Sequence, residues 1–238
     1  MPSTKNQLKP TAQNFLSELK SLDKTRLQQN TKYYTEKDTG NKIMGIVMSE
    51  LFGLAKVFTP MPINEIEKLL ENNFYEARMG AVCIMDFQAR DKKTSPERRK
   101  ELYALYIDRH DRINNWDMVD RSAPYVVGGY LFDKSRAPLY KLAKSKNTNE
   151  RRTSIVATYF FIRQNDVNDT FKIAEILVHD KDDLVNKAVG SWIREAGKRD
   201  EEQLIGFLDR FAGTMPRVTL RYAVEKFDKK VKEHYLKI

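Results

Sequence analysis

The chain has 238 residues, and its 42 lysines and arginines against 33 aspartates and glutamates give a formal net charge of +9. Because 41% of the residues are hydrophobic and 11% aromatic, the chain can bury a sizeable core, which excludes the class of disordered proteins. No run approaches the roughly 18 apolar residues of a membrane span, and the N-terminus lacks the apolar core of a signal peptide, so we expect a cytoplasmic protein without membrane contact.

The excess of positive charge indicates an anionic partner, and nucleic acid is the commonest large one. The basic residues are spread along the chain in short clusters, which is typical of a folded surface rather than of a disordered basic tail. Solubilising charge on exposed helix faces explains the same composition. From charge alone both interpretations stay open.

The few cysteines and histidines do not indicate a cysteine nucleophile, a histidine base or a metal site. The single cysteine, Cys83, lies in an apolar helical run and is predicted to be a core residue rather than a nucleophile. His110, in a charged stretch, is expected to be exposed or to cap a helix rather than to act as a base. The three histidines have no metal-ligand spacing, so we predict no metal and no cofactor.

Taken in chain order, the prolines and capping residues lie where helices are expected to begin or end. Pro60 and Pro62 break the chain, and Ser95 followed by Pro96 has the form of an N-cap with proline at the first helical position. Pro124 is expected to end a short helix. Alternating polar and β-branched runs are absent, so the pattern predicts an all-α fold.

Apolar stripes with helical spacing fill the second half of the chain. One runs from Asn149 to Gln164 and another from Asp169 to His179. A third begins at Asp182–Asp183, and its row is expected to face the core. The residues of that row are Leu184, Ala188, Trp192 and Ala196.

A weak internal repeat accompanies these stripes. The segment that begins at Arg78 resembles the one that begins at Arg152, and Lys187 opens a comparable helix, at intervals compatible with a helix-pair repeat of roughly 35–45 residues. Stacked helical pairs form a curved solenoid with a concave surface. Such a surface, if basic, suits a DNA duplex.

The stretch from Asp111 to Asp120 carries the most informative chemistry. After Asn114 or Asn115, either of which can cap a helix, Trp116 and Asp120 stand at i and i+4 on one helix face. A carboxylate beside an indole suits a cationic intermediate, because both attract positive charge. A core tryptophan with a solvated or ion-paired aspartate is the alternative.

This stretch and three others resemble the AlkD-like DNA alkylation repair glycosylases, which are built from HEAT-like helical repeats. The resemblance covers nearly the whole chain. The segments that carry it are 113–120, 150–156, 187–200 and 215–223. It implies a right-handed superhelical solenoid of HEAT-like helical pairs with a concave basic face. We expect one domain over 1–238, with a helical cap in about 1–45 and stacked pairs in 46–238.

The resemblance also assigns site residues. The aromatic residue of the family's lesion cleft matches Trp116, and its catalytic carboxylate matches Asp120. Its phosphate-binding arginine matches Arg152, because Ile155 follows at the family's interval, and Arg151 is the weaker candidate.

At the family's second cleft tryptophan the chain departs from the pattern. The matching position is Ser191, directly after Gly190. The neighbouring Trp192 is rotated by about 100° on a helix and is predicted to pack rather than to replace the missing ring.

The implied reaction is hydrolysis of the N-glycosidic bond of cationic alkylated purines, such as 7-methylguanine and 3-methyladenine, in duplex DNA for base excision repair. Asp120 would stabilise positive charge on the deoxyribose and orient water, without a dedicated base pocket.

We expect a monomer with no obligate protein partner. The alternatives are a non-catalytic member that binds damaged or branched DNA, and a helical scaffold that binds proteins.

Overall fold

A computed structural model describes residues 9–22 and 41–238, and over these residues the all-α prediction is confirmed. Their sole β pairing is an isolated bridge between Lys42 and Phe74. For Lys32, Tyr33, Tyr34 and Lys37 the sequence leaves two roles open, contact with DNA or capping of the solenoid, and these residues lie outside the described ones. In the same ranges, no helix is long and apolar enough to cross a membrane.

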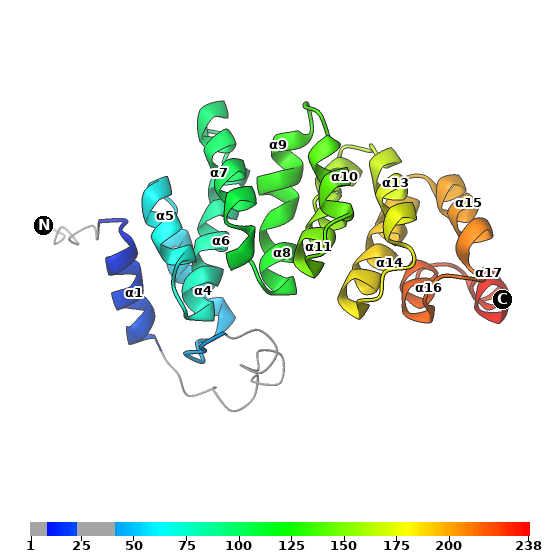
Figure 1. The fold of residues 1–238 in the computed structure, drawn as a ribbon, viewed down its shortest axis with the longest axis horizontal. Coiled ribbons are helices and arrows are strands. Elements are labelled where there is room, and N and C mark those ends of the chain that lie inside the picture. Colours follow the sequence, from blue (N-terminus) through cyan, green and yellow to red (C-terminus); the bar gives the residue numbers. More distant parts are fainter. Residues whose placement is uncertain (1–8, 23–40) are drawn as a thin grey trace, which may run out of the picture. The chain divides into compact units, whose positions relative to one another are not determined.

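The chain divides into two compact units, Met1–Ser122 (unit 1) and Ala123–Ile238 (unit 2). The single repeat domain stays a prediction. In unit 1, α6 packs against α4, α5 and α7, and α1 covers α4 and α5 (Figure 1). The helices of unit 1 are α1 (Ala12–Ser21), α4 (Met48–Val57), α5 (Ile63–Leu70), α6 (Tyr75–Arg90), α7 (Pro96–Asp108), the short η2 (His110–Arg112) and α8 (Trp116–Ala123).

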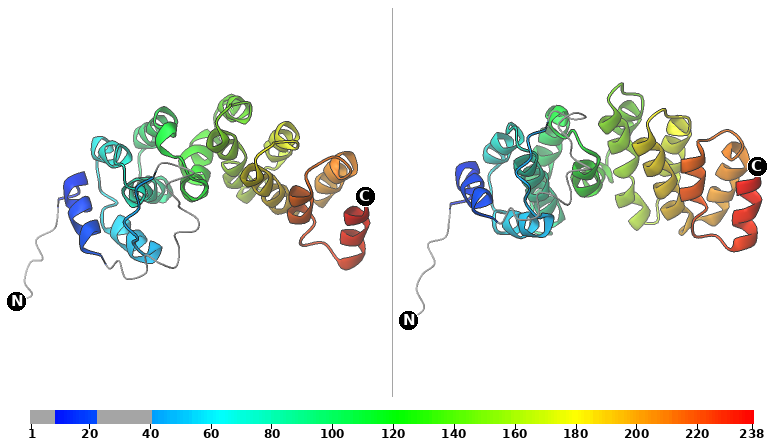
Figure 2. Two further views of the ribbon diagram at one scale, coloured as in Figure 1. Left: turned by 60° about the horizontal axis from the view of Figure 1, so that its bottom comes forward. Right: turned by 90° about the horizontal axis from the view of Figure 1, so that it is seen from below.

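Unit 2 is a stack of helical pairs that follow one another in chain order (Figure 2). Helices α10, α13 and α15 contact one another in turn and form a first row, while α11, α14 and α16 form a second row. The elements of unit 2 are η3 (Pro124–Gly128), α9 (Gly129–Leu131), α10 (Ala137–Ala143), α11 (Thr148–Val156), α12 (Tyr159–Arg163), α13 (Asn168–Leu177), α14 (Asp183–Gly197), α15 (Glu201–Phe211), α16 (Arg217–Ala223) and α17 (Lys229–Lys237).

Most predicted helix boundaries are confirmed by their capping bonds. Ser95 Oγ accepts a hydrogen bond from Arg98 N at 3.2 Å with Pro96 at the first helical position, and Asp182 caps α14. Pro62 occupies the N-cap position of α5. These polar side chains satisfy amide groups that the first helical turn leaves without partners.

Two boundaries differ from the prediction. The continuous helix expected from Asn149 to Gln164 is wrong, because a turn at residues 157–158 separates α11 from α12. Pro124 does end α8 at Ala123, but the chain continues as a five-residue π-helix instead of leaving the helical conformation. Proline is tolerated there because it occupies the first position of the new turn.

The predicted apolar stripes are mostly confirmed. Phe171, Ala174 and Leu177 of α13 are buried, as expected. In α14 the row assigned to the core is partly wrong: Leu184 is 38% exposed, and Trp192 is only half-buried. The α14 residues that the core buries are Val185, Ala188, Val189, Ile193 and Ala196.

The second row depends on one close approach between helices. A Cβ atom added at Gly190 of α14 would lie 2.5 Å from the Thr219 carbonyl oxygen and 2.7 Å from the Tyr222 Cβ atom on α16. Real Cβ atoms do not approach a carbonyl oxygen so closely, so only glycine lets α14 and α16 pack at this spacing. By contrast, nothing lies within 4 Å of a Cβ added at Gly206 in α15.

We therefore expect Gly190→Ala to lower the free energy of unfolding by about 1–3 kcal/mol, because the added methyl group pushes α16 away. Gly206→Ala, the matched control, should raise it by about 0.5–1 kcal/mol, because alanine loses less backbone entropy in a helix. Thermal and urea unfolding of both variants measure the difference. Equal effects of the two substitutions would contradict the proposed close packing.

Candidate functional site

Helix α8 begins at the residue that carries the predicted lesion-cleft ring. Of the two candidate caps, Asn115 takes this role, because its Oδ1 atom accepts a hydrogen bond from Trp116 N at 2.9 Å. Trp116 and Asp120 are both half-buried, whereas Met118 and Val119 point into the core. The predicted pair thus shares one partly accessible side of α8.

Two interactions with α6 fix how α8 is rotated. The Tyr75 hydroxyl donates a hydrogen bond to the Asp117 carboxylate, and Arg121 Nη2 lies 3.1 Å from Asp86 Oδ2. Asp117 and Arg121 are four residues apart and therefore lie on one face of α8. The row of Trp116 and Asp120 is the neighbouring one, about 100° away.

The ion pair at Asp86 is deeply buried. The Asp86 side chain is fully inaccessible, and Arg90 Nε also donates to it at 2.8 Å. The Arg121 guanidinium lies over the rings of Phe52, at 5.1 Å, and Phe87, at 4.8 Å. Burial raises the pKa of the Asp86 carboxyl, against the opposing effect of the two arginines.

Asp117 and Arg121 were missed as positioning residues by sequence reasoning. Their i, i+4 spacing was visible beside the Trp116–Asp120 pair, but nothing in the sequence identified Tyr75 and Asp86 as their partners on α6. In the structure they hold α8 so that the candidate pair keeps a defined direction.

In unit 2 the two adjacent arginines of α11 have different surroundings. Arg151 forms an ion pair with Asp180, with Nε to Oδ2 at 2.6 Å, and also donates to the Ser145 and Lys146 carbonyl oxygens. Arg152 is only 7% exposed, and its Nη1 atom donates to the Leu184 carbonyl oxygen at the start of α14.

Arg78 of α6, which the predicted sequence repeat aligns with Arg152, also bonds to a later segment of the chain. Its Nη2 atom lies 3.3 Å from Asn114 Oδ1, two residues before α8. Its buried guanidinium also donates to Asn41 and to the Asn72 carbonyl oxygen, and burial lowers the pKa of Arg78 to about 10. In both units, therefore, an arginine near the start of one helix is bonded to the start of a later one.

Ser191 and Trp192 are neighbours on α14, and both are half-buried. The Trp192 ring stacks on Tyr159, with ring centroids 4.7 Å apart and an angle of 35° between the planes. On the other side of α14, Arg194 pairs with Glu225. Trp192 therefore does pack, but against a partly accessible tyrosine rather than in the core.

Trp116 and Asp120 belong to unit 1, whereas Arg152, Ser191 and Trp192 belong to unit 2. The structure brings together the members of each group, through α8 in one unit and through the contact of α11 with α14 in the other. Convergence of the two groups on one DNA strand stays a prediction.

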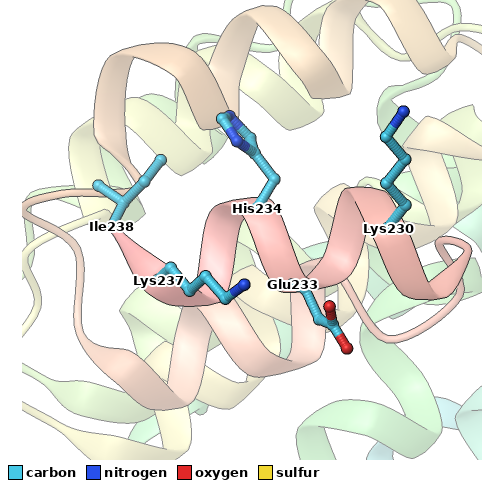
Figure 3. A pocket seen from close by; sticks show the side chains of 5 residues that line it. All are labelled: Lys230, Glu233, His234, Lys237 and Ile238. Carbon is cyan, nitrogen blue, oxygen red and sulfur yellow. The ribbon is translucent and has the colours of Figure 1, made fainter.

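Unit 2 has two shallow hollows away from these residues. One, of about 450 Å³, lies beside α17, where Lys230, His234 and Lys237 come from one helix (Figure 3). The other, of about 300 Å³, lies between α13 and α15 and includes Lys172 and Arg210. Both are open, and neither contains a predicted site residue.

Cys83 and His110 are both in the interior. Cys83 is fully buried, as predicted, and burial raises the pKa of its thiol to about 12. The expectation that His110 is exposed or capping is wrong: it is 3% exposed and packs edge-on against Tyr106, with ring centroids 5.4 Å apart. The charged residues next to His110 in the sequence did not indicate that its ring is buried.

Because only the thiolate reacts, Cys83 should resist a thiol reagent such as DTNB at pH 8 in the folded protein and react at once in 6 M guanidinium chloride. Absorbance of the released thiolate measures both rates. Fast reaction of the folded protein at pH 8 would contradict the buried position of Cys83.

Arg121→Met should lower the free energy of unfolding by about 3–5 kcal/mol, because it removes one of two partners of the buried Asp86 carboxylate. Arg163→Met is the matched control, since Arg163 is exposed and donates to the Tyr125 hydroxyl rather than to a buried carboxylate, so its loss should cost under about 1 kcal/mol. Urea unfolding compares the two. If both variants are equally stable, the Asp86–Arg121 pair does not hold α8.

Comparisons with known proteins agree with one another. The family described as DNA alkylation repair enzyme matches residues 15–227. Among solved structures, a predicted DNA alkylation repair enzyme from Enterococcus faecalis is similar, with a TM-score of 0.67 and 14% sequence identity over 87% of this chain and 97% of that one. At this identity the likeness shows the fold alone. None of the curated proteins compared with the chain matches it.

Proposed function

Because the chain belongs to the family of DNA alkylation repair enzymes, we propose that it is a DNA glycosylase. It hydrolyses the N-glycosidic bond of cationic alkylated purines, such as 7-methylguanine and 3-methyladenine, in duplex DNA. The observation that carries this proposal is the pairing of Trp116 and Asp120 on one partly accessible side of α8, in an orientation that Asp117 and Arg121 fix.

The chemistry needs few residues. An alkylated purine already carries positive charge and leaves without a strong general acid. The remaining barrier is positive charge that develops on the deoxyribose, as in other glycoside hydrolysis. The Asp120 carboxylate stabilises this charge and orients the attacking water. The Trp116 indole packs on the sugar, where its ring face attracts the same cation.

We propose that the second row of unit 2 binds the DNA backbone. Its helices α11, α14 and α16 carry six arginines and lysines against three carboxylates, whereas α10, α13 and α15 of the first row carry three against five. Segregated positive charge along one row favours contact with a phosphate backbone. We propose that this row is part of the concave basic face of a right-handed solenoid, with the chain as one domain.

Arg152 rather than Arg151 is proposed to hold a phosphate. Asp180 and two carbonyl oxygens take up the donors of Arg151. Arg152 is the position that matches the family's phosphate-binding arginine, and it bonds to the Leu184 carbonyl oxygen at the start of α14. The Leu184 bond then orients the guanidinium before DNA arrives.

Asp120→Asn should reduce release of 7-methylguanine from duplex DNA by at least about 100-fold, because it removes the negative charge that stabilises the transition state. DNA affinity, measured by fluorescence anisotropy, should change by less than about threefold, since no phosphate contact is lost. Release of free base is measured by liquid chromatography under single-turnover conditions.

Asp111→Asn is the matched control, since Asp111 is an exposed carboxylate nearby in sequence and loses the same charge. It should release base at the wild-type rate. Undiminished release by Asp120→Asn would rule out the mechanism.

A second candidate is a non-catalytic DNA-binding protein of the same family, which recognises damaged or branched DNA. The observation that favours it is Ser191, a small side chain at the position that matches the family's second cleft tryptophan. It predicts no base release by the wild type, together with salt-sensitive binding to lesion-free branched DNA. A protein-binding scaffold would instead bind DNA weakly and with little dependence on salt.

A further inference from the structure

The rings of Tyr159 and Trp192 lie more nearly parallel than two other half-buried ring pairs of unit 2, Tyr125–Phe160 and Phe132–Phe160, which meet edge-on with 88° and 63° between the planes. Phe171 and Phe207, which also pair, are almost completely buried and act as core. Tyr159 and Trp192 stack at 4.7 Å but both remain half-buried, so solvent reaches part of each side chain.

The pair lies at one end of the seam between α11–α12 and α14. At the other end, Arg152 bonds to the Leu184 carbonyl oxygen. Arg152 and Tyr159 are seven residues apart and Leu184 and Trp192 eight, so the two segments run parallel, and about 10 Å of seam separates the arginine from the rings. The turn at residues 157–158 lies directly before Tyr159.

Near Trp192 in sequence, α14 carries the small Ser191, the cation Lys187 and, one turn after Trp192, the anion Glu195. Ser191 adjoins Trp192, and Lys187, one turn earlier than Ser191 on the same side of α14, is half-buried. The second row, to which α11 and α14 belong, carries the excess of positive charge described above. Partly exposed aromatic rings among cations are the usual surface for an unpaired nucleotide, because every base has a face that stacks and every phosphate a charge.

We propose that Tyr159 and Trp192 form a stacking surface for an unpaired DNA base, with Lys187 close to the adjoining phosphate. The inference rests on the proposed function only in taking DNA as the ligand. It adds a preference for distorted or unpaired DNA that does not depend on Asp120 or on the reaction.

The chain has only two tryptophans, which makes the stacking directly measurable. In the Trp116→Phe protein, Trp192 is the sole tryptophan. Its emission is titrated with a lesion-free duplex that carries a two-base bulge, and with a fully paired duplex of equal length. We expect the bulged duplex to quench Trp192 and to bind at least about fivefold more tightly than the paired one.

Variants in the otherwise wild-type protein separate stacking from folding. Trp192→Leu and Tyr159→Leu should each abolish the preference for the bulged duplex, whereas Trp192→Phe should retain it. Phe211→Leu is the matched control: it removes a half-buried ring from the first row, which packs on Phe207 at 4.8 Å, and should leave the preference unchanged.

Equal quenching by the two duplexes, or a full preference in Trp192→Leu, would overturn the inference. If Trp192→Leu does not fold, the quenching experiment decides alone. The outcome is separable from that of the proposed reaction: a protein that prefers the bulge but releases no 7-methylguanine keeps this surface and loses the glycosylase. A protein that releases 7-methylguanine but does not prefer the bulged duplex keeps the glycosylase and loses this surface.

Discussion

The buried contact between Asp86 and Arg121 is the interaction on which the candidate site depends. A carboxylate without solvent access is costly to bury, and here two arginines compensate it while aromatic rings cover the guanidinium of one of them. Such a pair stabilises little compared with an apolar core, but it allows a single rotation of α8. Since Trp116 and Asp120 lie on the neighbouring row, their direction follows from that rotation.

Unit 2 contains a related contact between an arginine and a later helix. Arg152 bonds to the start of α14, as Arg78 of unit 1 bonds to the segment just before α8. In each unit, therefore, an arginine of one helix is bonded to a segment at or just before the start of a later helix. At Arg152 the same bond would preorganise a guanidinium for a phosphate, so a structural and a binding role are compatible in one side chain.

The sequence was sufficient for the helical class, the caps at Ser95 and Asp182 and the shared face of Trp116 and Asp120, because these depend on local spacing and capping chemistry. It was insufficient for the solvent exposure of Leu184 and His110, because this exposure depends on which neighbouring element covers each helix face. The partners of Asp117 and Arg121 on α6 are 42 and 35 residues away, and no local pattern identifies contacts of that kind.

The central claim is that a carboxylate held on α8 cleaves the bond to a cationic base. The most direct measurement is single-turnover release of free 7-methylguanine from a duplex with one such lesion, using the wild-type protein in excess. The account predicts first-order release well above the protein-free rate, with an abasic site left in the strand. Release at the protein-free rate, from a duplex that is demonstrably bound, would contradict it.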